Sequence, residues 1–112
     1  MCVITGWWNK NQNIDRDLFN SMRDSLSHRG PDGFDSYFCN SHNLALGHRR
    51  LSFLDLSESG TQPICNENKT IWLTVNGEIY NYLELRKELE EKHVFKSNTD
   101  SEVIIHAYEE WG

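Results

Sequence analysis

The sequence predicts an α+β domain whose strands pair mainly in antiparallel fashion. Three observations lead to this prediction. The chain has 112 residues, enough for one small domain. Its short apolar runs cluster and most can pair through short turns, which favours antiparallel sheets over a doubly wound parallel sheet. Three further segments have the four-residue apolar spacing or the capping residues that are typical of helices.

The first two elements are a strand over residues 2–8 and a helix over residues 15–27. The strand is a short apolar run, MCVITGWW, at the head of the chain. Apolar residues repeat every four positions along the helix: Leu18, Met22 and Leu26, with Phe19 beside them. Either Asp15 or Asn13 can cap its start.

A turn and two strands follow. Residues 30–33, Gly-Pro-Asp-Gly, end the helix and reverse the chain. Strands are expected over residues 34–39 and 43–54, joined at residues 40–41, with a break in the second strand near Gly47.

The remaining segments are a loop, a strand and two helices. Residues 57–63 form the loop, and residues 71–75, IWLTV, form a strand rich in β-branched and aromatic residues. Asn81 with Glu84 has the spacing of a capping box and opens a helix over residues 82–92.

Thr99 and Glu102 form a second capping-box pattern before the last helix. The predicted apolar face of that helix comprises Val103, Ile104, Ala107, Tyr108 and Trp111. Because this face needs something further to pack on, we expect the 112 residues to be part of a larger domain.

Composition excludes several classes of function. The formal net charge is −6, and Lys and Arg cluster only at Arg49–Arg50, which argues against nucleic-acid and anionic-membrane partners. No signal peptide and no membrane span are expected. Three cysteines without a CxxC pair favour a reducing, cytoplasmic compartment. No zinc-site spacing is present, so no metal ligand is expected.

Cys2 has two interpretations. If Met1 is removed, one residue carries both a thiol and an α-amine, whose reference pKa of about 7.7–8.0 makes it a base near neutral pH. The alternative is a buried structural cysteine on a strand, and position alone favours that alternative.

Asn76 and Gly77 also have two interpretations. Asn-Gly between apolar runs is a strong signal for a β-hairpin turn. The functional alternative is an oxyanion hole, in which the Asn amide and a backbone N–H donate to a developing negative charge.

Arg49 and Arg50 adjoin on a strand and therefore face opposite sides. One suits the surface, whereas the other can bind a substrate carboxylate through two parallel hydrogen bonds. Asp100 in the first turn of the last helix also has two interpretations. Its negative charge interacts favourably with the helix dipole, or it balances a substrate ammonium group.

Five segments together resemble a known family. MCVITGWW, SHRGPDG, LGHRRLSFLDLSESGTQP, VNGEIYNYLELRKEL and TDSEVIIHAYEEWG, in this order and spacing, resemble the N-terminal glutaminase domain of glutamine-hydrolysing asparagine synthetases. That resemblance implies a class II glutamine amidotransferase with the N-terminal-nucleophile hydrolase fold, an αββα sandwich. It implies that residues 1–112 are the N-terminal portion of such a domain, without its C-terminal part and without the synthetase domain.

The resemblance also implies roles for individual residues. Cys2 is the nucleophile, with its own α-amine as base, and Asn76 and Gly77 form the oxyanion hole. The implied substrate-binding residues are Arg50, Leu51, Ser52, Phe53, Leu54, Asn76, Gly77, Glu78 and Asp100. Arg50 binds the α-carboxylate of L-glutamine, whereas Glu78 and Asp100 surround its α-ammonium group.

The implied reaction converts L-glutamine to glutamate and ammonia through a thioester, and the ammonia serves asparagine synthesis or a related amidation. No cofactor is expected here, because ATP and magnesium belong to the synthetase domain, present in cis or in trans. A homodimer is a further expectation. Two alternatives stay open: a non-catalytic scaffold that binds a partner, prompted by Val3 and the short length, and an N-terminal-cysteine hydrolase of another amide.

Overall fold

The structure is a computed structural model that describes residues 2–51 and 61–112. Its centre is strand β3 (Leu44–Arg50), which lies between β1 (Val3–Trp8) and β2 (Gly33–Cys39) in a three-stranded sheet. Both pairings are antiparallel, as predicted. The expected break near Gly47 is wrong, because Gly47 pairs with Thr5 on one side and with Ser36 on the other.

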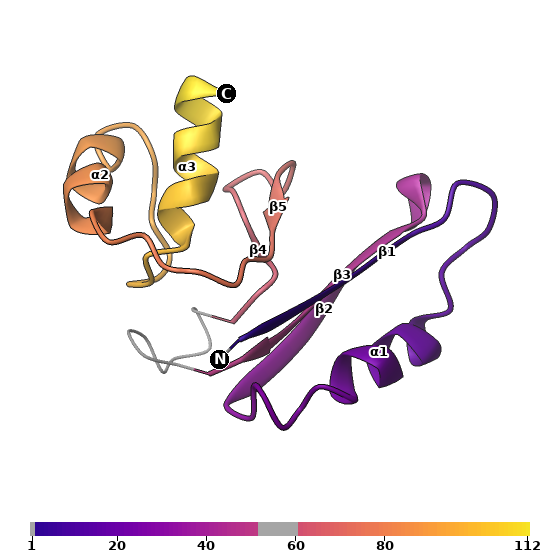
Figure 1. Cartoon of the computed structure of the whole chain (residues 1–112). Coiled ribbons are helices and arrows are strands. Elements are labelled where there is room, and N and C mark those ends of the chain that lie inside the picture. Colours follow the sequence, from indigo (N-terminus) through magenta and orange to yellow (C-terminus); the bar gives the residue numbers. More distant parts are fainter. Residues whose placement is uncertain (1, 52–60) are drawn as a thin grey trace.

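Helix α1 (Arg16–Asp24) covers one face of this sheet (Figure 1). The Asp15 carboxylate accepts a hydrogen bond from the N–H of Leu18 at 3.1 Å, which identifies Asp15 as the cap and leaves Asn13 outside the helix. Phe19 has no exposed surface and lies below Gly47, where a Cβ atom would stand 3.0 Å from the ring. The helix ends at Asp24, three residues before the predicted end at residue 27.

A second, two-stranded sheet lies on the side of the first sheet away from α1 (Figure 1). It pairs β4 (Ile64–Cys65) with β5 (Trp72–Leu73) in antiparallel fashion. The sequence predicted β5 as a longer strand over residues 71–75 and placed no strand at β4. The rings of Tyr37 on β2 and Trp72 on β5 stack 3.7 Å apart and join the two sheets.

Helices α2 (Tyr82–Leu89) and α3 (Glu102–Trp111) pack together beyond the second sheet. Both predicted capping boxes are wrong: Asn81 and Ser101 are the capping positions, and neither side chain makes a capping hydrogen bond. The carboxylate of Glu102 instead accepts from the backbone N–H groups of Lys96 and Ser97, both at 2.8 Å.

The buried face of α3 also differs from the predicted one. The residues it buries are Glu102, Val103, Ile105 and His106. Tyr108 and Trp111, both predicted on the apolar face, are 60% and 56% exposed. Polar contacts orient the helix so that the side chains of Glu102 and His106 face inward.

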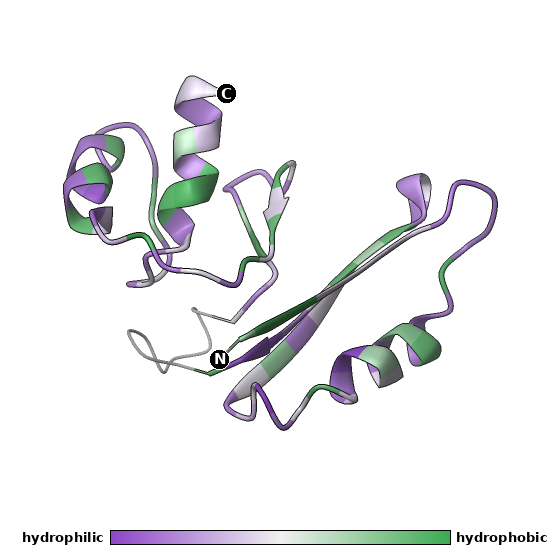
Figure 2. Cartoon of the chain, viewed as in Figure 1, coloured by the Kyte–Doolittle hydropathy of each residue, from purple (hydrophilic) through white to green (hydrophobic). Residues whose placement is uncertain are grey.

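The order of layers is helix, three-stranded sheet, two-stranded sheet, helices, which is the α+β arrangement with antiparallel sheets that the sequence predicted. Figure 2 shows apolar residues in β1 and at the start of α3, and a mixture of polar and apolar residues along α1. Across residues 2–51 and 61–112, no helix has the length and apolar character needed to cross a membrane.

Candidate active site

Cys2 lies at the head of β1, directly beside the end of β3. Its Sγ accepts a hydrogen bond from the N–H of Leu51 at 3.3 Å and lies 3.4 Å from the carbonyl oxygen of the same residue, to which it donates. The side chain is half-buried. The thiol is therefore held by the backbone of the neighbouring strand while one side of it stays accessible.

The two adjacent arginines do face opposite sides of the sheet, as predicted. Neither is a surface charge, since Arg49 is 9% and Arg50 is 7% exposed. Arg49 faces α1, where its guanidinium donates to the Gly30 carbonyl at 3.0 Å and to the Asp24 carboxylate at 2.9 Å. Arg50 faces the other way, next to Leu51, and its Nη1 lies 3.5 Å from the Thr61 hydroxyl.

His48 shares the face of Arg50 and connects the first sheet to the segment that carries Asn76. Its Nε2 lies 3.2 Å from the Val75 carbonyl oxygen, which can only accept, so this nitrogen carries the proton. The ring is 1% exposed, and its Nδ1 has no hydrogen-bond partner among the described residues. Burial lowers the pKa of His48 to about 4; the Val75 hydrogen bond opposes this shift and the Arg50 charge adds to it.

The segment after Val75 presents three candidate residues to solvent. Asn76, Gly77 and Glu78 are all exposed, and the chain runs from them into α2 without a returning strand, so the β-hairpin interpretation is wrong. Asp100 is 8% exposed, and its Oδ2 accepts from the N–H of Ile79 at 2.6 Å. Asp100 therefore fixes the backbone directly after Glu78.

Gln62 is a functional candidate that the sequence did not single out. Its Oε1 accepts from the N–H of Val75 at 2.7 Å, and its Nε2 lies 3.4 Å from the Ser101 hydroxyl. The side chain is 7% exposed. Gln62 thus joins the segment before Asn76 to the residue after Asp100, and nothing in the local pattern Thr-Gln-Pro indicates this role.

The structure therefore gathers the predicted residues in two adjoining groups. Cys2, Arg50 and Leu51 meet where β1 and β3 end, and Asn76, Gly77, Glu78 and Asp100 form the second group. His48 joins the groups through Val75. The predicted substrate-binding residues Ser52, Phe53 and Leu54 lie outside the described residues. A thiol and a guanidinium at the strand ends, together with an amide and carboxylates in the second group, suit acyl transfer on a zwitterionic substrate.

Cys39 lies in a polar setting at the far end of β2. Its Sγ is 3.4 Å from the Ser41 hydroxyl and 3.3 Å from Nδ1 of His42. Hydrogen bonds from Ser41 and His42 lower the pKa of this thiol to about 6. The structure thus places a thiol with thiolate character at Cys39, away from Cys2.

Comparison with known proteins finds a matching family model and relatives of two names. The model of a family described as "Glutamine amidotransferase domain" matches residues 1–112. The chain is 44% identical, over 96% of its length, to asparagine synthetase [glutamine-hydrolyzing] 1 of Bacillus subtilis, and 53% identical, over 78% of its length, to that of Arabidopsis thaliana. It is also 42% identical, over 80% of its length, to amidase chry2 of Gibberella zeae. The chain spans 17%, 14% and 13% of the lengths of these relatives.

Proposed function

Since the chain belongs to the family of glutamine amidotransferase domains, we propose that it carries out the glutaminase half-reaction of a glutamine-dependent amidation. In this reaction the side-chain amide of L-glutamine is hydrolysed to glutamate and ammonia. The observation that carries the proposal is the half-buried thiol of Cys2, held between the N–H and the carbonyl of Leu51 next to the buried Arg50.

Cys2 acts as the nucleophile in this proposal. Removal of Met1 exposes its α-amine, which takes the thiol proton directly or through a water molecule. The sulfur then attacks the amide carbon, a tetrahedral intermediate forms, and protonated nitrogen leaves as ammonia. Water hydrolyses the resulting glutamyl thioester and returns the free thiol.

Asn76 and Gly77 stabilise the oxyanion of the tetrahedral intermediate. The Asn76 amide and the N–H of Gly77 donate to it, and loss of one such donor typically raises the barrier by about 2.7–4 kcal/mol. Both residues are solvent-facing, which leaves them open to a substrate, and the backbone before them is fixed by His48 and Gln62. This fixed backbone supports an oxyanion hole whose donors need little reorganisation.

The two ends of the glutamine backbone are bound by opposite charges. Arg50 receives the α-carboxylate through its planar guanidinium. Asp100 and Glu78 balance the α-ammonium group, Asp100 through its carboxylate and also by fixing the turn at Ile79. Leu51 contributes backbone groups, and we assign the same role to Ser52, Phe53 and Leu54.

The ammonia serves an amidation by a synthetase domain, in cis or in trans. Relatives named asparagine synthetase make asparagine synthesis the first choice, and a related amidation is the second. ATP and magnesium are assigned to that synthetase domain, so the glutaminase step needs no cofactor. We place the reaction in the cytoplasm, and a homodimer stays a prediction. Family membership does not favour a non-catalytic scaffold or another amide substrate.

The test compares Cys2→Ala and Cys2→Ser with Cys39→Ser as the matched thiol control. The measured quantities are glutamate and ammonia released from L-glutamine by the protein that contains this chain. We expect both Cys2 variants to lose at least about 100-fold in kcat, because Ala has no nucleophile and the Ser hydroxyl is a weaker nucleophile than the thiol, while the control keeps the wild-type rate. Mass spectrometry of the N-terminus must show Cys2 first. Glutaminase activity retained in Cys2→Ala overturns the proposal.

A further inference from the structure

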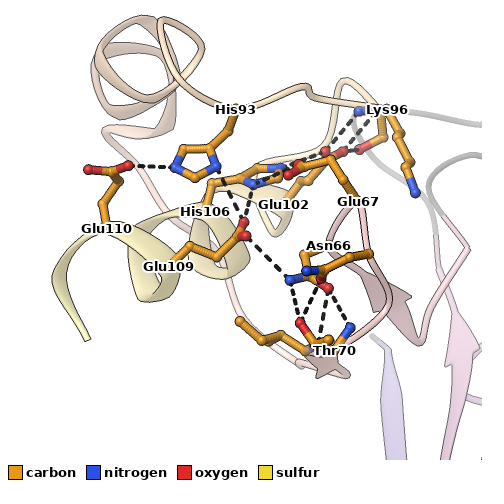
Figure 3. Close-up of polar contacts among 12 residues, drawn as sticks. Asn66, Glu67, Thr70, His93, Lys96, Glu102, His106, Glu109 and Glu110 are labelled. Atoms are coloured by element: carbon orange, nitrogen blue, oxygen red, sulfur yellow. Dashed lines mark hydrogen bonds and ion pairs between the residues drawn. The ribbon is translucent and has the colours of Figure 1, made fainter.

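A cluster of imidazole and carboxylate groups lies on α3, on the side away from Cys2. It comprises Glu67 in the turn between β4 and β5, His93 after α2, and His106 and Glu109 on α3. One donor atom from each residue lies within 4.8 Å of the other three. Figure 3 shows Glu109 joined to the rings of both His93 and His106 and to Asn66.

The atoms that lie close together in the cluster are imidazole nitrogens and carboxylate oxygens, which bind transition metals. Glu109 Oε1 lies 2.8 Å from Nδ1 of His106 and 3.5 Å from Nδ1 of His93, and Glu67 Oε1 lies 3.5 Å from Nδ1 of His106. In a tetrahedral zinc site with bonds of about 2.0–2.1 Å, neighbouring donor atoms are about 3.3 Å apart. Small side-chain movements therefore bring all four donors to one ion.

The outer nitrogen of each imidazole is held by a second carboxylate. Nε2 of His106 donates to Glu102 at 3.1 Å, and Nε2 of His93 donates to Glu110 at 2.8 Å. Both inner nitrogens, Nδ1, thereby turn toward Glu109. A carboxylate on the outer nitrogen is the arrangement that orients histidine ligands in metal sites.

The other groups around the cluster are also fixed. Asn66 is 2% exposed and its Nδ2 donates to the second oxygen of Glu109 at 3.3 Å. The Phe95 ring packs 4.5 Å from that of His106, which is 1% exposed. Oriented ligands on a partly buried platform distinguish this cluster from a group of surface acids.

Charge favours a bound cation. Four carboxylates surround the two rings: Glu67, Glu102, Glu109 and Glu110. In the described part of the chain, the ion pairs of these carboxylates reach one ammonium group, that of Lys92, 3.7 Å from Glu110. A divalent cation would supply the missing positive charge at the point where the four inner donors meet.

We propose that Glu67, His93, His106 and Glu109 form a four-coordinate Zn²⁺ site that fastens α3 to the turn between β4 and β5. Two imidazole nitrogens and two carboxylate oxygens suit zinc, whereas magnesium prefers six oxygen ligands. Four protein donors leave no open position, so the role of the ion is structural. The site is separate from Cys2 and does not depend on the glutaminase proposal.

The test uses the untagged full chain, freed of metal with EDTA and titrated with Zn²⁺ against a chromophoric chelator. We expect one Zn²⁺ per chain and a rise in Tm that Mg²⁺ at the same concentration does not produce. Co²⁺ should give the intense visible absorption of a four-coordinate site. Equal Tm shifts with Zn²⁺ and Mg²⁺, or Co²⁺ spectra of a six-coordinate ion, overturn the proposal.

Three variants localise the ion, and the first two have a matched control. His93→Gln removes a ligand and should weaken Zn²⁺ binding at least about 100-fold, while His28→Gln, an exposed histidine elsewhere, keeps wild-type affinity. Glu110→Gln removes an outer partner and should cost about 10- to 100-fold, compared with Glu91→Gln on the neighbouring exposed turn. Glu67→Gln, with its side chain 41% exposed, tests a ligand whose loss leaves the fold intact.

Circular dichroism of each metal-free variant checks that the fold is retained. Cys39 and His42 are a second pair of side chains that could bind Zn²⁺. The variant Cys39→Ser removes this pair and should leave Zn²⁺ binding unchanged. Loss of binding in Cys39→Ser, or wild-type affinity in both His93→Gln and Glu67→Gln, overturns the proposal.

Discussion

His48 is a buried histidine whose protonation state is set by its surroundings. It is 1% exposed, its Nε2 donates to the Val75 carbonyl, and its pKa lies near 4. The ring is therefore neutral at physiological pH. Because Val75 precedes Asn76, a protonated His48 would place a charge in the wall of the proposed oxyanion hole. The same residue thus links stability and the geometry of the site to pH.

Stability should fall in acid through His48. The folded-state pKa of about 4 lies below the ordinary value of 6.5, so the unfolded chain binds the proton first. This contribution is complete above pH 6.5 and is lost as the pH falls toward 4. Between about pH 7.5 and about pH 4.5 it amounts to about 2–3 kcal/mol.

The measurement is urea unfolding of wild type and His48→Gln at the two pH values. Carboxylates with lowered pKa, such as Asp24, Glu102 and Glu110, weaken both proteins in acid and cancel in the comparison. The wild type should lose about 2–3 kcal/mol more than the variant. Equal losses would contradict the assignment, and His28→Gln serves as the exposed-histidine control.

Cys39 should react with iodoacetamide in mild acid. A thiol of pKa about 6 is half ionised at pH 6, and lower nucleophilicity offsets only part of that gain. We expect Cys39 in the folded chain to react about tenfold or more faster at pH 6 than in a Ser41→Ala, His42→Gln double variant. Peptide mass spectrometry measures the rates; identical rates would show that the two hydrogen bonds do not stabilise the thiolate.

At the scale of elements, the turn between α1 and β2 is fixed against β3. Arg49 donates to the Gly30 carbonyl and stacks on the Phe34 ring, 4.9 Å from its centre. Asp24, at the end of α1, accepts from both Arg23 and Arg49. The Asp24 carboxylate is 46% exposed, so the lasting contribution is the burial of the arginine stems rather than the ion pairs.

Gly30→Ala should destabilise this turn. An added Cβ would stand 2.5 Å from the carbonyl carbon of Arg49 and 2.8 Å from the Arg50 nitrogen, both backbone atoms that cannot yield freely. The expected cost is about 2 kcal/mol or more, measured as a shift of the urea midpoint. Gly6→Ala is the matched control, because the added Cβ would meet no atom within 4 Å beyond its chain neighbours in residues 2–51 and 61–112. Equal midpoints for the two variants would contradict the prediction.

Local patterns predicted the elements better than their ends. The helix α1 and the Asp15 cap were visible in the sequence and are confirmed, whereas Leu18 and Met22 of the predicted apolar spacing are 50% and 41% exposed. The capping box of Thr99 and Glu102 failed because the Glu102 carboxylate accepts from the backbone N–H groups of Lys96 and Ser97 instead. Competition between a local cap and a tertiary hydrogen bond cannot be judged from spacing alone.

At the scale of the whole molecule, two sheets are docked through a few specific contacts. Tyr37 stacks on Trp72, and His48 donates to the carbonyl of Val75, in the segment that follows β5. Both contacts use the face of the first sheet away from α1. The position of Asn76 relative to Cys2 therefore depends on sheet docking, and contacts between strands distant in sequence determine it.

A double-mutant cycle should show that the Tyr37–Trp72 stack couples the sheets. Tyr37→Leu and Trp72→Leu are each expected to destabilise the chain, and the double variant by less than their sum. The expected coupling is about 0.5–1.5 kcal/mol, from unfolding free energies of the four proteins. Additive losses would show that the rings contribute through burial alone.

The candidate site was predictable as a set of residue types but not as an arrangement. Cys2, Arg50, Asn76 and Asp100 could be selected only through the family resemblance of the five segments, because the residues alone left structural alternatives open. Gln62 and His48 could not, since their roles depend on backbone groups of Val75 that no side-chain pattern reveals. The proposed zinc ligands could not be selected from the sequence either, because they come from three segments and only His106 and Glu109 share a helix.

The Tyr37–Trp72 stack also gives the molecule an optical signature. The two rings lie 3.7 Å apart with an angle of 11° between their planes, so their electronic transitions couple in a fixed, asymmetric geometry. That coupling contributes to near-ultraviolet circular dichroism and disappears when side-chain packing is lost. Near-ultraviolet circular dichroism can thus follow, without a label, the relative orientation of the sheet that carries the thiol and the segment that carries the amide during turnover.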